Sequence, residues 1–275
     1  KIGVMKKNWT GERWETFVHN ETALEHLHRY AVACELSANK NVLDIACGEG
    51  YGSRLLALNA TAVTGVDIDA ATIQKAKEKY KAPHLGFLTA DARATPLSSG
   101  IFDLVVSFET LEHLEDHEQL VGEFKRLLKP DGQLVISTPD TDQYSLKNGY
   151  TNPFHKKELN RKQFETLLQT YFKNVQIMTQ QICHSSLISY PGQTRFDQYS
   201  GDPDQLKKNK AANGLYMIAI ASDEKLPEIN NSLFNGNSIL QAALDDQEKM
   251  FRQTLTYRVG HRLLSPFKWI KTLFK

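Results

Sequence analysis

The sequence predicts an α/β protein with a Rossmann-like, doubly wound and mostly parallel seven-stranded sheet, helices on both faces and a C-terminal helical extension. Three observations predict this fold. An apolar segment, 42–46, runs directly into a turn that contains Gly48 and Gly50. A helical segment follows, and then a second apolar segment that ends in Asp67, about 20 positions after the turn. Further apolar segments alternate with helical ones as far as residue 222.

Hydrophobic periodicity and turn residues place the elements of this fold. Helices are expected at 21–37, 52–58, 70–80, 117–128 and 160–171, and strands at 42–46, 63–67, 85–88, 103–108, 133–137, 174–182 and 215–221. Pro130 and Gly132 end the fourth of these helices, and Asn160 caps the fifth.

The glycine turn and the acidic residue are typical of a crevice that binds a nucleoside. Glycine is needed at positions 48 and 50 because a ligand must approach the backbone closely, and a Cβ atom would block it. The Asp67 carboxylate supplies two acceptors for two ribose hydroxyls. An ordinary tight turn from strand to helix is the alternative, which the matched strands and the spacing of the acid disfavour.

The chain divides into four predicted parts. Residues 1–39 form an N-terminal cap segment and a helix over the crevice, and 40–222 form the main domain. Within that domain, a long polar segment at about 184–213 is expected to be a lid of the acceptor site, with a surface insertion as the alternative. Residues 223–237 are a linker, and 238–275 are a basic amphipathic helical tail.

Composition narrows the class of protein. The net charge of +1 gives no general reason to expect a nucleic acid partner. The three cysteines are too few and too scattered for a disulfide framework or a zinc site. No apolar run approaches the ~20 residues of a membrane span, and no signal peptide is visible. We therefore expect a cytoplasmic protein. The chain begins with Lys1 rather than Met, as a piece of a longer protein would.

The order D-x-A-C-G-E-G from Asp44 resembles the first motif of class I S-adenosylmethionine-dependent methyltransferases. The resemblance continues at Thr89–Ala92 and through 102–109 and 128–139, so it covers residues 40 to 222. It implies S-adenosylmethionine as cofactor, with the methionine moiety at Asp44, Gly48 and Gly50 and the adenine amine at Asp91. The full set of cofactor-binding residues implied is Asp44, Ala46, Gly48, Gly50, Asp67, Ile68, Asp91, Ala92 and Phe108.

The sequence Glu109-Thr110-Leu111-Glu112-His113 follows the fourth strand, at the edge of the sheet where ligands bind. His155 follows the fifth strand toward the same edge. Two carboxylates and two imidazoles there could hold a divalent ion, Mg²⁺ or Mn²⁺, which would activate an acceptor hydroxyl.

This E-x-x-E-H pattern with a downstream histidine resembles the metal site of small-RNA terminal 2′-O-methyltransferases, and its first part is similar to ubiquinone-biosynthesis O-methyltransferases. The resemblance implies Glu109, Glu112, His113 and His155 as metal ligands and His113, Glu109 and His155 as catalytic residues. Two alternatives stay open: a metal-free general base at His113 or His155, and a structural role for these side chains.

Four further segments indicate which molecule accepts the methyl group. Gly11–Trp14, Glu25–Ala31, Ser137–Pro139 and Asn152–His155 resemble methyltransferases of surface-polysaccharide and lipopolysaccharide pathways, so the resemblance implies O-methylation of a saccharide. Arg13 and Tyr30 are expected over the methionine carboxylate, with packing as the alternative for Tyr30.

Three different functions compete with this interpretation. Without a basic stripe and interleaved aromatics, nucleic acid is a minor candidate as acceptor. A metal-independent small-molecule or N-methyltransferase would use a histidine base in place of the ion. A catalytically silent scaffold in a glycan-assembly complex would bind the cofactor without transferring its methyl group.

The tail has its own pattern. From Lys249 to Lys275 there are seven Lys or Arg and no acidic residue, with large apolar residues between them. Such a segment could lie on the anionic inner face of a membrane, bind a partner such as a glycosyltransferase, or join two copies in a homodimer. The alternative is a helix packed on its own domain, bent at Pro266.

Overall fold

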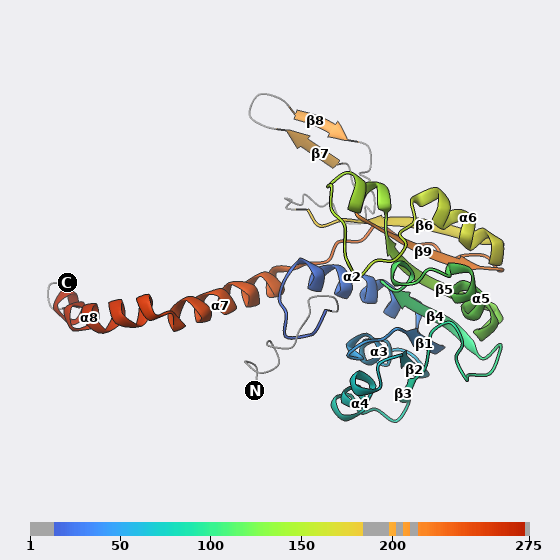
Figure 1. Ribbon diagram of the computed structural model, residues 1–275, viewed down its shortest axis with the longest axis horizontal. Coiled ribbons are helices and arrows are strands. Elements are labelled where there is room, and N and C mark those ends of the chain that lie inside the picture. Colours follow the sequence, from blue (N-terminus) through green and yellow to red (C-terminus); the bar gives the residue numbers. More distant parts are fainter. Residues whose placement is uncertain (1–13, 184–197, 202–205, 210–213, 273–275) are drawn as a thin grey trace.

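The computed structural model describes residues 14–183, 198–201, 206–209 and 214–272. In chain order its elements are α2 (Glu21–Leu36), β1 (Asn41–Ile45), α3 (Tyr51–Leu56), β2 (Ala62–Asp67), α4 (Ala70–Lys79), β3 (Leu85–Thr89), β4 (Phe102–Phe108), η1 (Leu111–His113), α5 (His117–Leu127), β5 (Leu128–Pro139), η2 (Asp142–Leu146), α6 (Arg161–Tyr171), β6 (Asn174–Gln180), β7 (Gln198–Gly201), β8 (Leu206–Asn209), β9 (Tyr216–Ser222), α7 (Asn237–Gln253) and α8 (Leu255–Thr272) (Figure 1).

Seven strands form the main sheet in the order β3-β2-β1-β4-β5-β9-β6. The first five are parallel to one another, and β9 runs antiparallel to both of its neighbours. The order reverses between β1 and β4, so the crevice where a doubly wound sheet binds ligands lies beside these two strands. The predicted fold class is confirmed.

One strand differs in extent from the prediction. β5 begins at Leu128 rather than at residue 133, because Leu128 already pairs with Phe102 of β4. The register then shifts between Phe102 and Leu104. Pro130 and Gly132, expected as signals that end a helix, therefore lie in an irregular first part of the strand. A Cβ atom on Gly132 would lie 2.9 Å from Leu128 Cδ2 and 3.0 Å from the Phe102 carbonyl oxygen, so glycine suits this close approach.

Helices cover both faces of the sheet. Alternate residues of β4 point to opposite faces: Val105 joins a core with Phe124 of α5 and Phe164 of α6. Leu104 joins a second core with Tyr30 of α2 and Leu56 of α3. This period of two is what a strand buried on both sides requires.

Short polar side chains fix where the helices begin. Asp69 accepts hydrogen bonds from the backbone N–H groups of Ala71 and Thr72, and Asp116 accepts one from Gln119. At α6, Asn160 and Gln163 form the reciprocal pair of a capping box. Asn160 thus caps this helix as predicted.

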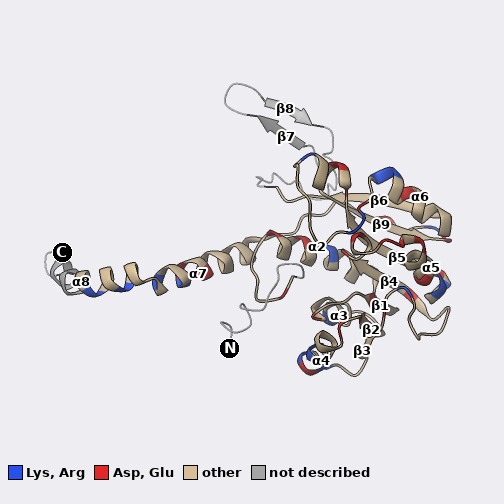
Figure 2. Ribbon diagram, in the orientation of Figure 1, with Lys and Arg blue, Asp and Glu red and all other residues tan. Residues whose placement is uncertain are grey.

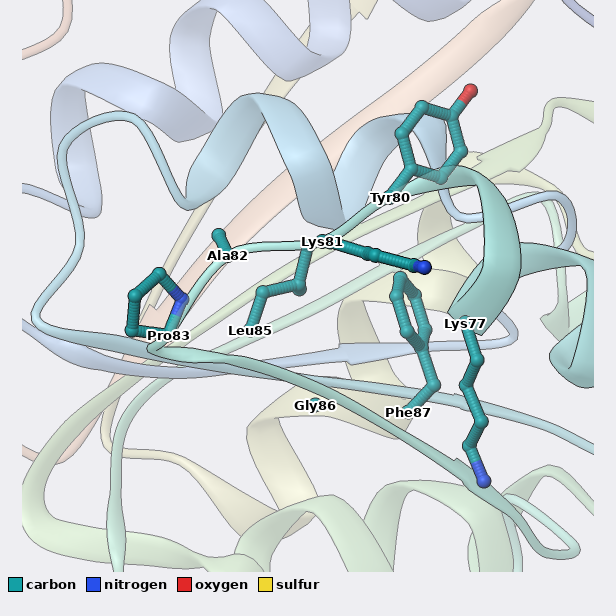
Figure 3. A pocket seen from close by; sticks show the side chains of 8 residues that line it. All are labelled: Lys77, Tyr80, Lys81, Ala82, Pro83, Leu85, Gly86 and Phe87. Atoms are coloured by element: carbon teal, nitrogen blue, oxygen red, sulfur yellow. The ribbon is translucent and has the colours of Figure 1, made fainter.

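A hollow of about 590 Å³ lies beside the edge strand β3 and is lined from the end of α4 by Lys77, Tyr80 and Lys81 (Figure 3). It shares no lining residue with the cavity at the carboxyl ends of the parallel strands, which is described below.

The segment predicted as a lid falls partly outside the described residues. Within it, β7 and β8 pair with each other as an antiparallel ribbon and not with the main sheet. The helices α7 and α8 extend away from the sheet as an arm (Figure 1). Among the described residues, no helix is long and apolar enough to cross a membrane.

Candidate active site

A cavity of about 550 Å³ opens at the carboxyl ends of the parallel strands. One part of it, the glycine-turn half, is lined by Ala46, Cys47, Gly48, Glu49, Asp67, Ile68, Ala90, Asp91 and Ala92. The other part, the histidine half, is lined by Glu109, Thr110, Glu112, His113, Leu114, Tyr144, Tyr150, Asn152, Pro153, Phe154, His155 and Tyr216. Phe108 and aromatic side chains around α2 and α3 line the space between them. This volume is in the range of small-molecule sites.

The backbone of the glycine turn is left-handed at three positions, with φ of 57° at Ala46, 53° at Gly48 and 84° at Gly50. A Cβ atom on Gly48 would meet nothing within 4 Å, so the backbone there is open to a ligand. A Cβ atom on Gly50 would lie 2.8 Å from the Phe87 ring. Packing against β3 and a positive φ therefore favour glycine at position 50, in addition to the close approach of a ligand that the sequence suggested.

Asp67 ends β2 with both carboxylate oxygens engaged. Oδ2 accepts from the backbone N–H of Gly48 at 2.9 Å, and Oδ1 accepts from that of Asp69 at 2.9 Å. These bonds fix the carboxylate at the mouth of the turn, with Ile68 exposed beside it.

Asp91 is held by Arg93, which donates from Nη2 to Oδ2 at 2.6 Å and from Nε to Oδ1 at 3.0 Å. These hydrogen bonds hold the pKa of Asp91 below its usual value.

Asp44 does not line the cavity. Its side chain is buried beneath the turn, where it accepts hydrogen bonds from Ser53 Oγ at 2.6 Å and from the Tyr30 hydroxyl at 3.0 Å. Burial raises the pKa of Asp44 to about 7. A Cβ atom on Gly52 would lie 1.9 Å from the Tyr30 ring, so this glycine leaves room for that tyrosine. Tyr30 thus packs α2 onto the turn, and Arg13, its predicted companion, lies outside the described residues.

Three predicted metal-ligating residues meet in the histidine half. Glu112, His113 and His155 each offer a ligand atom, and these atoms all lie within 4.8 Å of one another. Glu109, the fourth predicted ligand, is not part of this cluster. Its Oε1 lies 3.1 Å from Arg29 Nη1 and accepts a hydrogen bond from Ser137 Oγ at 2.7 Å. The geometry therefore gives a set of three ligands where the sequence suggested four.

Each of the two histidines is oriented by its Nδ1 atom. His113 Nδ1 lies 3.0 Å from the carbonyl oxygen of Phe154, and His155 Nδ1 lies 2.6 Å from Glu158 Oε1. Because both partners are acceptors, Nδ1 carries the proton in each neutral ring, and Nε2 keeps a lone pair. The Nε2 atom of His113 lies 4.0 Å from Glu112 Oε1, and that of His155 lies 3.0 Å from the Asn152 amide nitrogen.

The carboxylate of Glu112 is buried. Burial raises the pKa of Glu112 well above its usual range, and the neighbouring Glu109 carboxylate raises it further. Glu112 Oε2 accepts a hydrogen bond from Thr138 Oγ1 at 3.2 Å, and the Glu112 backbone carbonyl accepts one from the Lys156 N–H. The Glu112 main chain thus connects η1 to the segment that carries His155.

Arg29 lies behind the histidine half and is one of the largest fully buried side chains. Its Nε donates to Gln180 Oε1 at 2.7 Å, and its guanidinium lies 4.4 Å from the centre of the Tyr216 ring. Nearby, burial raises the pKa of Glu25 to about 7. One arginine therefore faces the carboxylates of Glu25 and Glu109 at this side of the cavity.

The tyrosines of the histidine half were not predicted from the sequence. Tyr144 stacks on His155 with ring centres 5.5 Å apart and also lies near Tyr150 and Tyr216. Tyr216 opens β9 and pairs with Pro139, the last residue of β5. Because β9 is antiparallel, its first residue lies at the same edge as the last residues of the parallel strands, a signal that could have indicated Tyr216.

Comparisons with known proteins identify the domain. Residues 43–136 match the family model described as "Methyltransferase domain". A protein of Mycolicibacterium smegmatis, named as a probable S-adenosylmethionine-dependent methyltransferase, is 35% identical over 164 residues, which are 58% of this chain and 63% of that relative. Residues 43–136 thus form a methyltransferase domain. The chain spans less than two thirds of that relative's length.

Solved structures agree with the fold. A protein of Pyrococcus horikoshii superposes with a TM-score of 0.56 at 18% identity, covering 80% of this chain and 99% of that one. An S-adenosylmethionine-dependent methyltransferase of Archaeoglobus fulgidus gives 0.53 at 22% identity, covering 73% of this chain and 93% of that one.

Proposed function

We propose that this protein is an S-adenosylmethionine-dependent O-methyltransferase that methylates a hydroxyl of a saccharide, with a divalent ion held by Glu112, His113 and His155. The observation that carries the proposal is a single cavity whose glycine-turn half suits the cofactor and whose histidine half suits an acceptor hydroxyl. The cofactor, when bound, supplies an electrophilic methyl group and leaves as S-adenosylhomocysteine.

The glycine-turn half supports the first part of the proposal. Gly48 offers open backbone, and the Asp67 carboxylate is already oriented by two backbone N–H groups. Asp67 and Asp91 lie at the ends of successive strands, where ribose hydroxyls and an adenine amine would find acceptors. Asp44 acts indirectly, because it supports the turn from beneath through Ser53 and Tyr30.

The donor set fits a divalent ion. Each histidine donates its Nδ1 proton to an oxygen and keeps the Nε2 lone pair, as in histidines that bind metals. One carboxylate and two imidazoles without a thiolate favour Mg²⁺, Mn²⁺ or a similar ion over structural zinc. When bound, the ion supplies positive charge that lowers the pKa of a nearby hydroxyl.

The remaining residues of the histidine half would act on the acceptor directly. When the cofactor is bound, the acceptor oxygen would take its methyl group. The hydroxyl proton would pass to the Glu109 carboxylate, which Arg29 and Ser137 hold in place. If no ion is used, His113 Nε2 is the proton acceptor instead.

The lining supports a neutral polyol as acceptor. Tyr144, Tyr150, Phe154 and Tyr216 offer aromatic faces, and Asn152 offers an amide. No Lys or Arg occurs among the described residues that line this cavity, so nothing there favours the phosphates of a nucleic acid. Aromatic faces with a few polar groups suit the apolar faces and hydroxyls of a sugar ring.

The test is methyl transfer from labelled cofactor to a panel of oligosaccharides, amines, phenols, hydroxylated lipids and nucleoside-terminated RNA, with and without chelator. We expect label on a saccharide oxygen, loss of activity with chelator, and recovery with Mg²⁺ or Mn²⁺. Activity unaffected by chelator would replace the ion with a general base at His113. Label on an amine alone would contradict O-methylation.

A matched pair of variants tests the cluster itself. Glu112→Gln should abolish metal-dependent turnover, whereas Glu118→Gln, an exposed glutamate of α5, should leave it unchanged. If cofactor binds but no panel member is ever methylated, a silent scaffold becomes the better explanation.

A further inference from the structure

Within the part of the chain that the structure describes, the arm formed by α7 and α8 contacts the domain near its first turns. Ile239 packs against the core that contains α2 and α3. Asp246 Oδ2 lies 3.0 Å from Nδ1 of His19, at the entrance to α2. Beyond that point, the hydrogen bonds, ion pairs and ring contacts described for residues 247–263 join them to other residues of the arm.

Large apolar side chains of the arm are exposed. Leu255, Val259 and Leu263 follow one another every four residues, which places them along one side of α8. Their exposed fractions are 76%, 47% and 66%, and Phe251 at the end of α7 is 61% exposed. A helix that packed on its own domain would bury this side, so the packed alternative suggested by the sequence does not describe residues 255–263.

The outer part of the arm, from residue 249 on, carries charge of one sign. Residues 249–275 contain seven Lys or Arg and no acidic residue, whereas the other 248 residues contain 26 Lys or Arg and 32 Asp or Glu. Figure 2 shows basic residues along the outer part of the arm. Arg258 and Arg262, four residues apart, lie next to the apolar side of α8. This basic part of the arm is therefore attracted to an anionic surface. The rest of the chain has a net negative charge and is repelled by such a surface.

We propose that α8 and the outer part of α7 lie on the surface of an anionic lipid bilayer. The apolar side of α8 enters the boundary between head groups and acyl chains, and the flanking arginines pair with lipid phosphates. The chain ends α7 at Thr254 with ψ of 146°, and Thr254 Oγ1 accepts a hydrogen bond from the Tyr257 N–H at the start of α8. The helical backbone is therefore interrupted between α7 and α8.

A second copy of the chain suits this surface less well. Paired helices need complementary charges beside an unbroken apolar seam. Here the charges beyond Glu248 are all basic, and the seam is interrupted where α7 ends at Thr254. Two such arms side by side would repel each other.

The experiment is co-sedimentation of the 275-residue chain with vesicles of phosphatidylcholine, alone or mixed with phosphatidylglycerol. We expect binding only to the mixed vesicles, weakening with added salt because charge attraction is screened within ~10 Å at 0.1 M. The double variant R258E/R262E should lose at least about tenfold in binding. L255S/V259S should also lose binding, because it removes apolar contact without changing charge.

The matched control is K77E/K81E, which makes the same change of charge on two exposed lysines beside β3 (Figure 3). It should bind as the unmodified chain does. Absence of binding to anionic vesicles, or equal binding by the control and R258E/R262E, would overturn the proposal. So would a dimer in sedimentation equilibrium that L255S/V259S dissociates, because the apolar side would then belong to a second copy.

Discussion

The glycine-turn half and the histidine half of the cavity are built by different means. The first draws its lining from residues 46–92, in which three successive strands bring their ends together, and its key donors are backbone N–H groups. The second gathers side chains from the end of β4, the segment after β5 and the start of β9. The first half therefore depends on backbone conformation, and the second on long-range packing of side chains.

If this contrast is correct, the largest effect on chemistry comes from the histidine half. His113→Ala should lower kcat by ~10²- to 10⁴-fold, because either a ligand or a general base is lost. Cofactor affinity, measured by calorimetry, should change little, because the cofactor depends on the other half. A parallel loss of cofactor affinity would show that the two halves are not separable.

The protonation of Glu25, which lies behind the histidine half, should affect the free energy of unfolding. Burial raises the pKa of Glu25 to about 7 in the fold, which Arg29 opposes and Glu109 and Glu21 reinforce, from an ordinary value of 4.5. Between pH 4.5 and about pH 7 the Glu25 carboxyl group is deprotonated in the unfolded chain but stays protonated in the folded chain. The contribution of Glu25 to the free energy of unfolding therefore falls as the pH rises.

Glu25→Gln should remove about 3 kcal/mol of this pH dependence between pH 4.5 and 7, as measured by urea unfolding at both pH values. An identical pH dependence in the variant and the unmodified chain would mean that Glu25 titrates normally in the fold.

For the glycine-turn half, Asp67→Ala should weaken cofactor binding by ~2 to 3 kcal/mol, because a carboxylate that accepts from hydroxyls in a partly buried site is lost. Calorimetry would measure this. Glu78→Ala, at an exposed position of α4, is the control and should bind normally. Unchanged affinity in Asp67→Ala would place the ribose elsewhere.

The smallest effect separates the two glycines of the turn. Gly50→Ala should reduce the free energy of unfolding by ~2 kcal/mol, because it combines a positive φ with contact against the Phe87 ring. A Cβ atom on Gly48 meets open space, so Gly48→Ala should reduce the free energy of unfolding by only ~1 kcal/mol. Gly48→Ala should nevertheless weaken cofactor binding more than Gly50→Ala does. The opposite order in either measurement would contradict the distinction between packing and ligand approach.

The sequence alone determined the sheet, the glycine turn and the order of the motifs, because these follow from short-range rules. Strand periodicity, turn chemistry and capping act over a few residues, and the predicted helix at Asn160 and the strands up to residue 108 lie where the pattern placed them. The same rules put Glu112, His113 and His155 at one edge, since the ends of parallel strands must meet there.

Only the tertiary structure decided which of these side chains face one another. The pairing of Glu109 with Arg29 joins β4 to a helix 80 residues earlier, and no local pattern encodes it. Tyr216 enters the cavity because β9 runs antiparallel, and Gly50 packs on Phe87 because β3 lies next to β2. Such contacts depend on the packing of elements far apart in the chain, which periodicity cannot specify. The exposure of the apolar side of α8 likewise depends on where α7 leaves the domain.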